Sequence, residues 1–150
     1  SLVVPDQIID YTWGRKSTFH ENSDEPVVHI DFTEPYDDGV RRRILAAGVT
    51  AGQPIVDGAV YAATQGPRLE TAAEINRLER DGADLVGMTG MPEAALAREL
   101  GIPYAAINVV ANFAAGRASS EHEICFDSID AVLREAMGRV RNVLDHLCEA

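Results

Sequence analysis

Short apolar runs alternate with segments of helical periodicity along the chain, and this alternation most constrains the fold. Strand candidates, each bounded by Gly, Pro or polar residues, lie at 2–4, 26–32, 57–65, 83–88 and 104–112. Apolar positions at helical spacing occupy residues 38–48, 71–81, 92–100 and 127–147. Elements that alternate in this way predict an α/β fold: a mixed, largely parallel central sheet flanked by helices. The apolar run at 104–112 is typical of a central parallel strand.

Several of the predicted helices have recognisable end signals. Thr71 and Glu74 form an S/T-x-x-E capping box, so a helix is expected to begin with Thr71 as its N-cap. Pro92 stands near the first position of the next helix, and Gly101 follows its end. Gly48 is likewise expected to end the helix that begins at residue 38. These signals make the helix limits the firmest part of the prediction.

Length and charge narrow the class of protein. A chain of 150 residues suits a single domain with a sizeable core. Its net charge of −11 argues against a nucleic-acid-binding surface, because phosphate backbones attract basic patches. It leaves room for a small phosphate substrate, which needs only a local group of donors. No apolar run approaches the length of a bilayer span, so no membrane partner is expected.

The cysteines and the first residues bear on the setting of the chain. Cys125 and Cys148 form neither a disulfide framework nor a metal-binding spacing, which favours a reducing cytoplasm. The chain opens on SLVVPDQ, without Met and inside an apparent strand. We therefore expect that residues upstream, forming an N-terminal portion, are missing.

Three segments follow predicted strands and are candidates for a ligand site: residues 64–70 (TQGPRLE), 87–90 (GMTG) and 111–116 (ANFAAG). Ligands of open α/β sheets gather at the carboxyl ends of the strands, so these segments are expected to meet there. Their notable side chains are Glu70, Met88, Thr89, Asn112 and the small residues from Ala114 to Gly116. The sequence has no Ser-His-Asp order, H-E-x-x-H, G-x-G-x-x-G or Walker loop. The residues alone indicate a small polar ligand held without a metal.

The run GPRLETAAEINRLERDGADLVGMTGMPEAALARELGIPYAAINVVAN, residues 66–112, resembles the core of the trimeric purine nucleoside phosphorylase and methylthioadenosine phosphorylase family. The likeness extends from VVPDQIIDYT through HIDFTEPYD to the C-terminal helix. It implies that residues 1–150 are a single nucleoside phosphorylase domain, or its C-terminal portion. It also implies cleavage of a purine nucleoside by inorganic phosphate as co-substrate, with no cofactor, in a homotrimer.

The resemblance gives roles to residues that also have plain structural readings. It makes Glu70 the acceptor of the purine N1–H, although Glu70 could instead complement a helix dipole. It places Asn112 opposite purine N7, although Asn112 could simply end a strand in a turn. Met88, otherwise a core residue, would line the ribose, and Leu69 would lie against the base. Thr89, just before a helix, would contact phosphate, in a position where anions bind.

The base can be narrowed further by resemblance. Adenine-cleaving members carry two Asp carboxylates in the stretch that matches Asn112 to Ala114, and a small residue at the position of Glu70. A carboxylate at Glu70 suits the N1–H donor of hypoxanthine or guanine and would repel the N1 lone pair of adenine. The sequence therefore predicts a 6-oxopurine nucleoside.

The 5′ end of the sugar involves other residues. Ile129, Val132 and Leu133 match apolar positions that surround a 5′-sulfur in methylthio-specific members, although they could equally be ordinary helix core. His29 would reach the sugar of a neighbouring subunit, or be a plain surface histidine. Together the two ends predict S-methyl-5′-thioinosine as substrate. Three alternatives stay open: an inosine/guanosine phosphorylase, a methylthioadenosine phosphorylase, and a non-catalytic nucleoside-binding fragment. The last is open because the Gly-rich phosphate loop and Arg-His contacts of the family's first half are absent from these residues.

Overall fold

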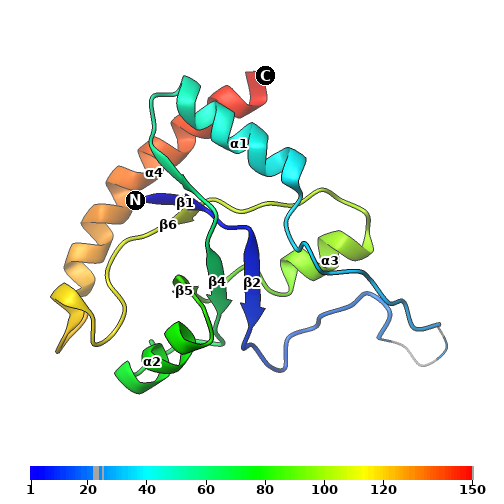
Figure 1. Cartoon of the computed structure of the whole chain (residues 1–150), viewed down its shortest axis with the longest axis horizontal. Coiled ribbons are helices and arrows are strands. Elements are labelled where there is room, and N and C mark those ends of the chain that lie inside the picture. The colour runs from blue at the N-terminus through cyan, green and yellow to red at the C-terminus, as the bar shows by residue number, and fades with distance from the viewer. Residues whose placement is uncertain (22–23, 25, 150) are drawn as a thin grey trace.

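The computed structural model describes residues 1–21, 24 and 26–149 (Figure 1). The elements in chain order are β1 (Leu2–Val4), β2 (Gln7–Asp10), α1 (Asp38–Thr50), β3 (Ile55–Asp57), β4 (Val60–Ala63), α2 (Ala72–Arg80), β5 (Leu85–Gly87), α3 (Glu93–Glu99), β6 (Asn108–Val109), a 3-10 turn at Ala118–Ser120, and α4 (Phe126–Glu149). The four predicted helices are thus confirmed, with limits that differ by a few residues at most. The expected end at Gly48 is wrong, because α1 continues past this buried glycine to Thr50 and is capped by Ala51.

The strands form two three-stranded sheets. In the first, β1 lies between β3, to which it is parallel, and β6, to which it is antiparallel. In the second, β4 lies between β2 and β5, and both pairings are parallel. Only Pro5 and Asp6 separate β1 from β2, so the chain passes directly from one sheet to the other (Figure 1). The prediction of an α/β fold with mixed, largely parallel strands flanked by helices is confirmed.

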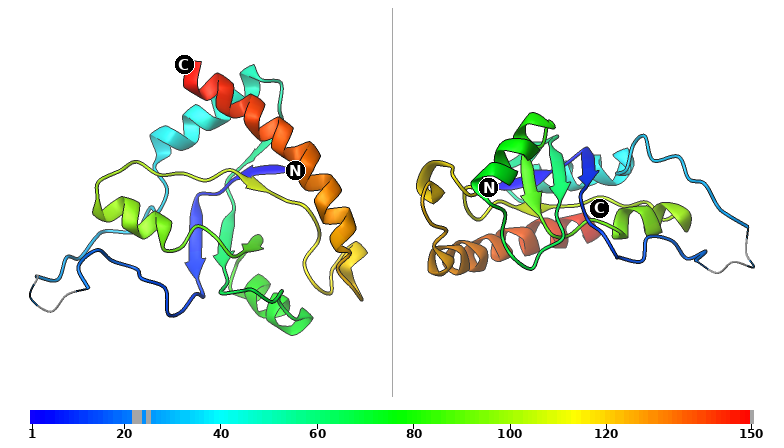
Figure 2. Two further views of the ribbon diagram at one scale, coloured as in Figure 1. Left: turned by 180° about the vertical axis from the view of Figure 1, so that it is seen from behind. Right: turned by 90° about the horizontal axis from the view of Figure 1, so that it is seen from below.

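The expected strand at 26–32 is wrong. Residues 26–32 have no strand pairing and belong to the long segment between β2 and α1, which projects from the body of the molecule (Figures 1 and 2). Val27 is 77% exposed there. An apolar run becomes a strand only when its backbone groups pair with those of a neighbouring strand, and in the described ranges this run pairs with neither sheet.

The expected parallel strand at 104–112 is also wrong in extent and direction. Only Asn108 and Val109 form a strand, and it runs antiparallel to β1. The backbone before it has another partner, because the Tyr104 carbonyl accepts a hydrogen bond from the Asp37 N–H at 2.7 Å, and the Tyr104 ring stacks on Tyr36. The apolar run therefore serves mainly as a connection between α3 and the short edge strand.

Three apolar clusters hold the elements together. In the first, side chains of β1 pack between α1 and α4, which lie side by side in Figure 1: Leu2, Val4, Ile44, Ala47, Val140 and Val143. The other two cover opposite faces of the second sheet. Tyr61 and Ala63 of β4 pack toward α3, and the intervening Ala62 packs toward Ile75 and Leu78 of α2. This alternation is that of a strand buried on both faces.

Within the described part of the chain, no helix combines the length and the apolar character that crossing a membrane would need.

Candidate active site

The carboxyl ends of β4 and β5 lie next to each other and carry two of the three predicted site segments. The Thr64 N–H donates to the Gly87 carbonyl at 2.7 Å, which aligns the two strand ends. Gly66, with a φ of +64°, then turns the chain toward α2. A Cβ at Gly66 would lie 2.4 Å from the sulfur of Met88, so only glycine lets the Met88 side chain pack here.

Glu70 points to these strand ends and away from the helix that follows it. Its Oε1 accepts a hydrogen bond from the Thr64 hydroxyl at 2.7 Å. The N-terminus of α2 is capped by other groups, because the Thr71 hydroxyl accepts from the Glu74 N–H and the Glu74 carboxylate accepts from the Thr71 N–H. The predicted capping box is confirmed. Glu70 takes no part in this cap, and its second carboxylate oxygen, Oε2, remains able to accept a hydrogen bond from a ligand.

Glu74 is held by a second partner as well. The guanidinium of Arg68 donates to both of its carboxylate oxygens, at 2.7 and 2.8 Å. This pair, followed by the bond from the Thr71 N–H, lowers the pKa of the Glu74 carboxyl to about 2. Glu74 is therefore ionised at neutral pH, and it fixes Arg68 beside Glu70.

A cleft of about 310 Å³ opens where these groups meet. Its lining comes from the end of β2, from the turn after β4 and from α2: Tyr11, Trp13, Thr64, Gln65, Gly66, Arg68, Glu70, Glu74, Arg77 and Leu78. The cleft combines two aromatic side chains with two carboxylates and two guanidinium groups. That mixture suits a flat, polar heteroaromatic ligand better than an aliphatic one.

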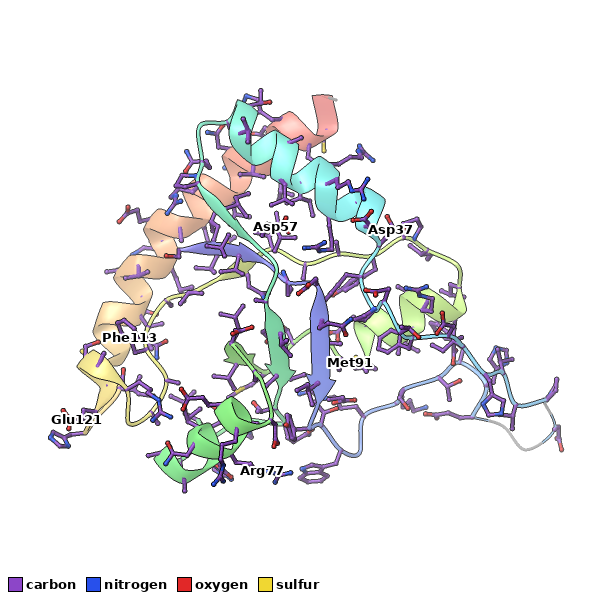
Figure 3. The ribbon with its side chains drawn as sticks, viewed as in Figure 1. Asp37, Asp57, Arg77, Met91, Phe113 and Glu121 are labelled. Carbon is purple, nitrogen blue, oxygen red and sulfur yellow. The ribbon has the colours of Figure 1, made fainter. Side chains whose placement is uncertain are left out.

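The outer wall of the cleft is organised around Tyr11. Its hydroxyl donates to the Asp81 carboxylate at 2.6 Å, and the guanidinium carbon of Arg77 lies 5.4 Å from the centre of its ring. Figure 3 shows Arg77 on α2, beside the end of β2. Burial and then the bond to Asp81 raise the pKa of the Tyr11 phenol, so Tyr11 remains a neutral donor. The wall is therefore pre-organised.

Thr89 lies just after β5 and is hydrogen-bonded to Tyr61, a residue that the sequence analysis did not single out. The Tyr61 hydroxyl lies 3.2 Å from the Thr89 Oγ1 and accepts from the Thr89 N–H at 3.3 Å. Tyr61 is only 6% exposed, whereas Thr89 is exposed at the strand end. Nothing in the local sequence marks Tyr61, because its role depends on which strand lies beside β4.

Arg15 is the second residue that sequence reasoning missed. Its guanidinium donates to the carbonyls of Met88 and Met91 on one side, and of Thr64 and Gln65 on the other. One cation thereby joins the segments that follow β4 and β5. The available signal was its place within DYTWGR, a stretch of the family resemblance, but no chemistry could be attached to it from sequence.

The third predicted segment approaches from β6. Ala114 packs against the cluster of Ala62, Ile75 and Leu78, and a Cβ at Gly116 would lie 2.8 Å from the Cβ of Ala72. This segment therefore lies against the start of α2, although β6 belongs to the other sheet and runs antiparallel to β1. Asn112 is exposed, and its Nδ2 donates to the Phe113 carbonyl at 2.6 Å. Leu69 is also at the surface, 36% exposed.

Four predicted residues are not brought to the strand ends. His29 is exposed in the projecting segment between β2 and α1. Ile129, Val132 and Leu133 lie in the first turns of α4, where Val132 is 38% exposed, and none of the four lines the cleft. These turns lie to one side of α2 in Figures 1 and 2, and Phe113 lies beside them in the view of Figure 3.

Comparison with known proteins gives a class that agrees with this geometry. The model of the phosphorylase superfamily matches residues 1–149, and the chain belongs to that superfamily. Among curated relatives, a probable S-methyl-5′-thioinosine phosphorylase of Xanthomonas campestris is 52% identical over 93% of this chain and 52% of its own length. A 6-oxopurine nucleoside phosphorylase of Pyrococcus furiosus is 46% identical over 77% of the chain and 45% of its own length.

Solved structures agree in fold. A mutant adenosine/methylthioadenosine phosphorylase from Schistosoma mansoni, in complex with tubercidin, superposes with a TM-score of 0.89 at 29% identity. The match covers 97% of this chain and 58% of that one. The nucleoside phosphorylase fold is therefore established for these residues. The chain spans about half the length of the curated relatives it matches.

Proposed function

We propose that the protein cleaves a 6-oxopurine nucleoside with inorganic phosphate, and that its substrate is S-methyl-5′-thioinosine. The products would be hypoxanthine and 5-methylthioribose 1-phosphate. The observation that carries the proposal is the placement of Glu70: outside the α2 cap, bonded to Thr64, and lining a cleft at the strand ends.

The carboxylate selects the base. The Glu70 side chain accepts a hydrogen bond from the N1–H of hypoxanthine, whereas adenine presents a lone pair at N1 and would leave two acceptors facing each other. A buried mismatch of this kind discriminates strongly. The names of the bacterial and archaeal relatives at 46–52% identity support this choice over an adenine nucleoside.

The reaction needs charge stabilisation at two places. A phosphate oxygen bonds to C1′ as the bond from C1′ to N9 breaks, and the purine leaves with the bonding electron pair. The Asn112 amide, once turned from the Phe113 carbonyl, faces N7 and stabilises the charge that develops on the purine. The Thr89 hydroxyl contacts phosphate. Because phosphate is the nucleophile, positioning and charge compensation account for the catalysis, with no cofactor and no metal.

The 5′-methylthio group is assigned to an apolar wall of Ile129, Val132 and Leu133, with His29 supplied by a neighbouring subunit of a homotrimer. These residues stand apart from the cleft in one protomer. The exposed apolar side chains of the projecting segment, Trp13, Phe19 and Val27, support its use as a contact between subunits.

The test is a panel of nucleosides supplied to the full-length protein with and without phosphate. We expect kcat/KM to be highest for methylthioinosine, lower for inosine and guanosine, and lowest for methylthioadenosine. Each buried methyl or methylene should favour methylthioinosine by about 0.8 kcal/mol. A preference for inosine would make the protein an ordinary inosine/guanosine phosphorylase, and a preference for the adenine nucleoside would overturn the role of Glu70. Binding of nucleosides with no release of base would indicate a non-catalytic domain.

A further inference from the structure

We propose that Tyr61 is a positioning residue that orients the Thr89 hydroxyl toward the phosphate ion. This inference rests on the proposed function, because it takes Thr89 as a phosphate contact. Tyr61 comes from the middle of β4, and its ring is buried in the cluster that faces α3. Only its hydroxyl reaches the upper edge of the sheet, where it meets Thr89.

The donors and acceptors of this contact can be assigned. A phenol has one hydrogen to donate and can accept at its oxygen. The Thr89 N–H donates to the Tyr61 oxygen, so the oxygen is already an acceptor. The phenolic hydrogen is buried and needs an acceptor, and the Thr89 Oγ1 lies 3.2 Å away. Tyr61 therefore donates to the Thr89 Oγ1, which leaves the threonine hydrogen free to point outward to an anion.

Gly87 makes this contact possible. A Cβ at Gly87 would lie 2.2 Å from the Tyr61 hydroxyl oxygen, whereas a Cβ at Gly90 would be in ordinary contact with the Cε1 of the same ring, at 3.8 Å. The backbone at Gly87 thus passes closely by the end of the Tyr61 side chain. Gly90 has a φ of +82°, a conformation that residues with a Cβ rarely adopt. The backbone of the GMTG segment therefore leaves room for the Tyr61 hydroxyl at Gly87.

The contact with Tyr61 fixes the orientation of the Thr89 side chain, which a threonine at a strand end would not have by itself. An exposed threonine samples its rotamers, and each bound phosphate must then select one of them. Here both the backbone and the hydroxyl of Thr89 are bonded to one buried atom. The expected benefit is therefore tighter phosphate binding, with little effect on the chemical step.

The experiment compares the full-length wild type with Tyr61→Phe, which removes only the phenolic oxygen. Tyr104→Phe is the matched control, since it removes a phenolic oxygen from a ring that packs against the same cluster. Calorimetric titration with inorganic phosphate measures binding without catalysis, and initial rates give KM for phosphate, KM for the nucleoside and kcat. We expect Tyr61→Phe to weaken phosphate binding and to raise KM for phosphate by at least about fivefold. KM for the nucleoside and kcat at saturating phosphate should stay within about twofold, and Tyr104→Phe should match the wild type.

A second variant covers the case in which Tyr61→Phe does not fold. Gly87→Ala keeps the phenol but pushes its oxygen away from Thr89, so it should weaken phosphate binding in the same direction. Equal phosphate affinity in the wild type and the folded variants would overturn the inference. Weakened phosphate binding in a protein that releases no purine would support the role of Tyr61 and refute the proposed phosphorolysis. A wild type that binds no phosphate would refute both.

Discussion

The two sheets are built on the same scale, yet their ends differ in chemistry. The sheet of β3, β1 and β6 is covered by α1 and α4, and its cluster consists of aliphatic side chains such as Leu2, Val4 and Val143. The carboxyl edge of the sheet of β2, β4 and β5 carries polar contacts instead. There the Arg15 guanidinium donates to the Thr64 carbonyl, and the Thr64 hydroxyl donates to the Glu70 carboxylate. The second sheet also has apolar clusters on both faces, so the difference between the two sheets lies in the polar contacts at this edge. The function proposed above gives those contacts a use, and the predictions below test whether stability and ligand binding separate in this way.

The largest expected effect is on the first sheet. Leu2 is fully buried, so Leu2→Ala should lower the free energy of unfolding by about 2–5 kcal/mol through lost contacts and a residual cavity. The folded fraction should keep the wild-type KM for nucleoside and phosphate. Urea unfolding and initial rates measure the two properties on the same full-length sample. A change in KM would mean that the two sheets are not separate in function.

The next largest expected effect is a loss of turnover at the proposed site. Asn112→Ala should lower kcat by about 10²–10³-fold, because the developing charge on the purine loses its partner. Since Asn112 is exposed and bonds only to the neighbouring Phe113 carbonyl among the contacts described, stability should change by less than about 0.5 kcal/mol. Phosphate-dependent release of hypoxanthine, with thermal unfolding as control, provides the measurement. Normal turnover would return Asn112 to the role of a turn residue.

Glu70→Gln separates a ligand contact from a helix-dipole partner. As a base contact, the change should lower kcat/KM for 6-oxopurine nucleosides by at least about tenfold, since a charge-assisted hydrogen bond is lost. Combined with Asn112→Asp, it should also relax the bias against adenine. Glu79→Gln is the control, because Glu79 is a carboxylate of α2 that pairs with Arg117 at 2.6 Å, outside the cleft. If hypoxanthine release is unchanged in Glu70→Gln, the substrate assignment loses its main support.

The smallest effect concerns acid stability. Because the folded-state pKa of Glu74 is lowered from 4.5 to about 2, its contribution to stability is complete above pH 4.5 and is lost as the pH falls toward 2. The difference in stability between the wild type and Glu74→Gln should therefore shrink across that interval. Thermal unfolding between pH 6 and pH 2.5 follows it, with Glu135→Gln on an exposed position of α4 as control. A constant difference would show that Arg68 does not hold the Glu74 carboxylate.

Local features of the sequence predicted local features of the fold. The four helices and the Thr71–Glu74 capping box follow from spacing and end residues within a few positions, so they could be predicted. The adjacency of two predicted site segments also followed, because the parallel order of β4 and β5 sets the segment after Thr64 beside the segment after Gly87. These predictions needed no knowledge of distant contacts beyond the general rule for α/β sheets.

What could not be predicted depends on pairing between distant segments. The run at 104–112 has the composition of a central strand, but the Asp37 N–H takes the carbonyl of Tyr104. The run at 26–32 has the composition of a strand but pairs with neither sheet in the described ranges. Tyr61 has the pattern of a core aromatic, and its contact with Thr89 depends on β5 lying beside β4. For Tyr104 and Tyr61 the deciding partner lies more than 20 positions away, and nothing local records it.

The four carbonyls bound by Arg15 also determine when the site can form. Its partners lie 49 to 76 positions further along the chain, so their contacts close long loops. They can form only when the segments after β4 and β5 are already adjacent, so the geometry of this edge depends on the pairing of those two strands. Leu2 and Val4 are fully buried, whereas Thr64 and Met88 are only partly buried. Amide hydrogen exchange should therefore be faster at Thr64 and Met88 than at Leu2 and Val4, which would make this edge a part of the molecule that opens locally while the first sheet stays closed.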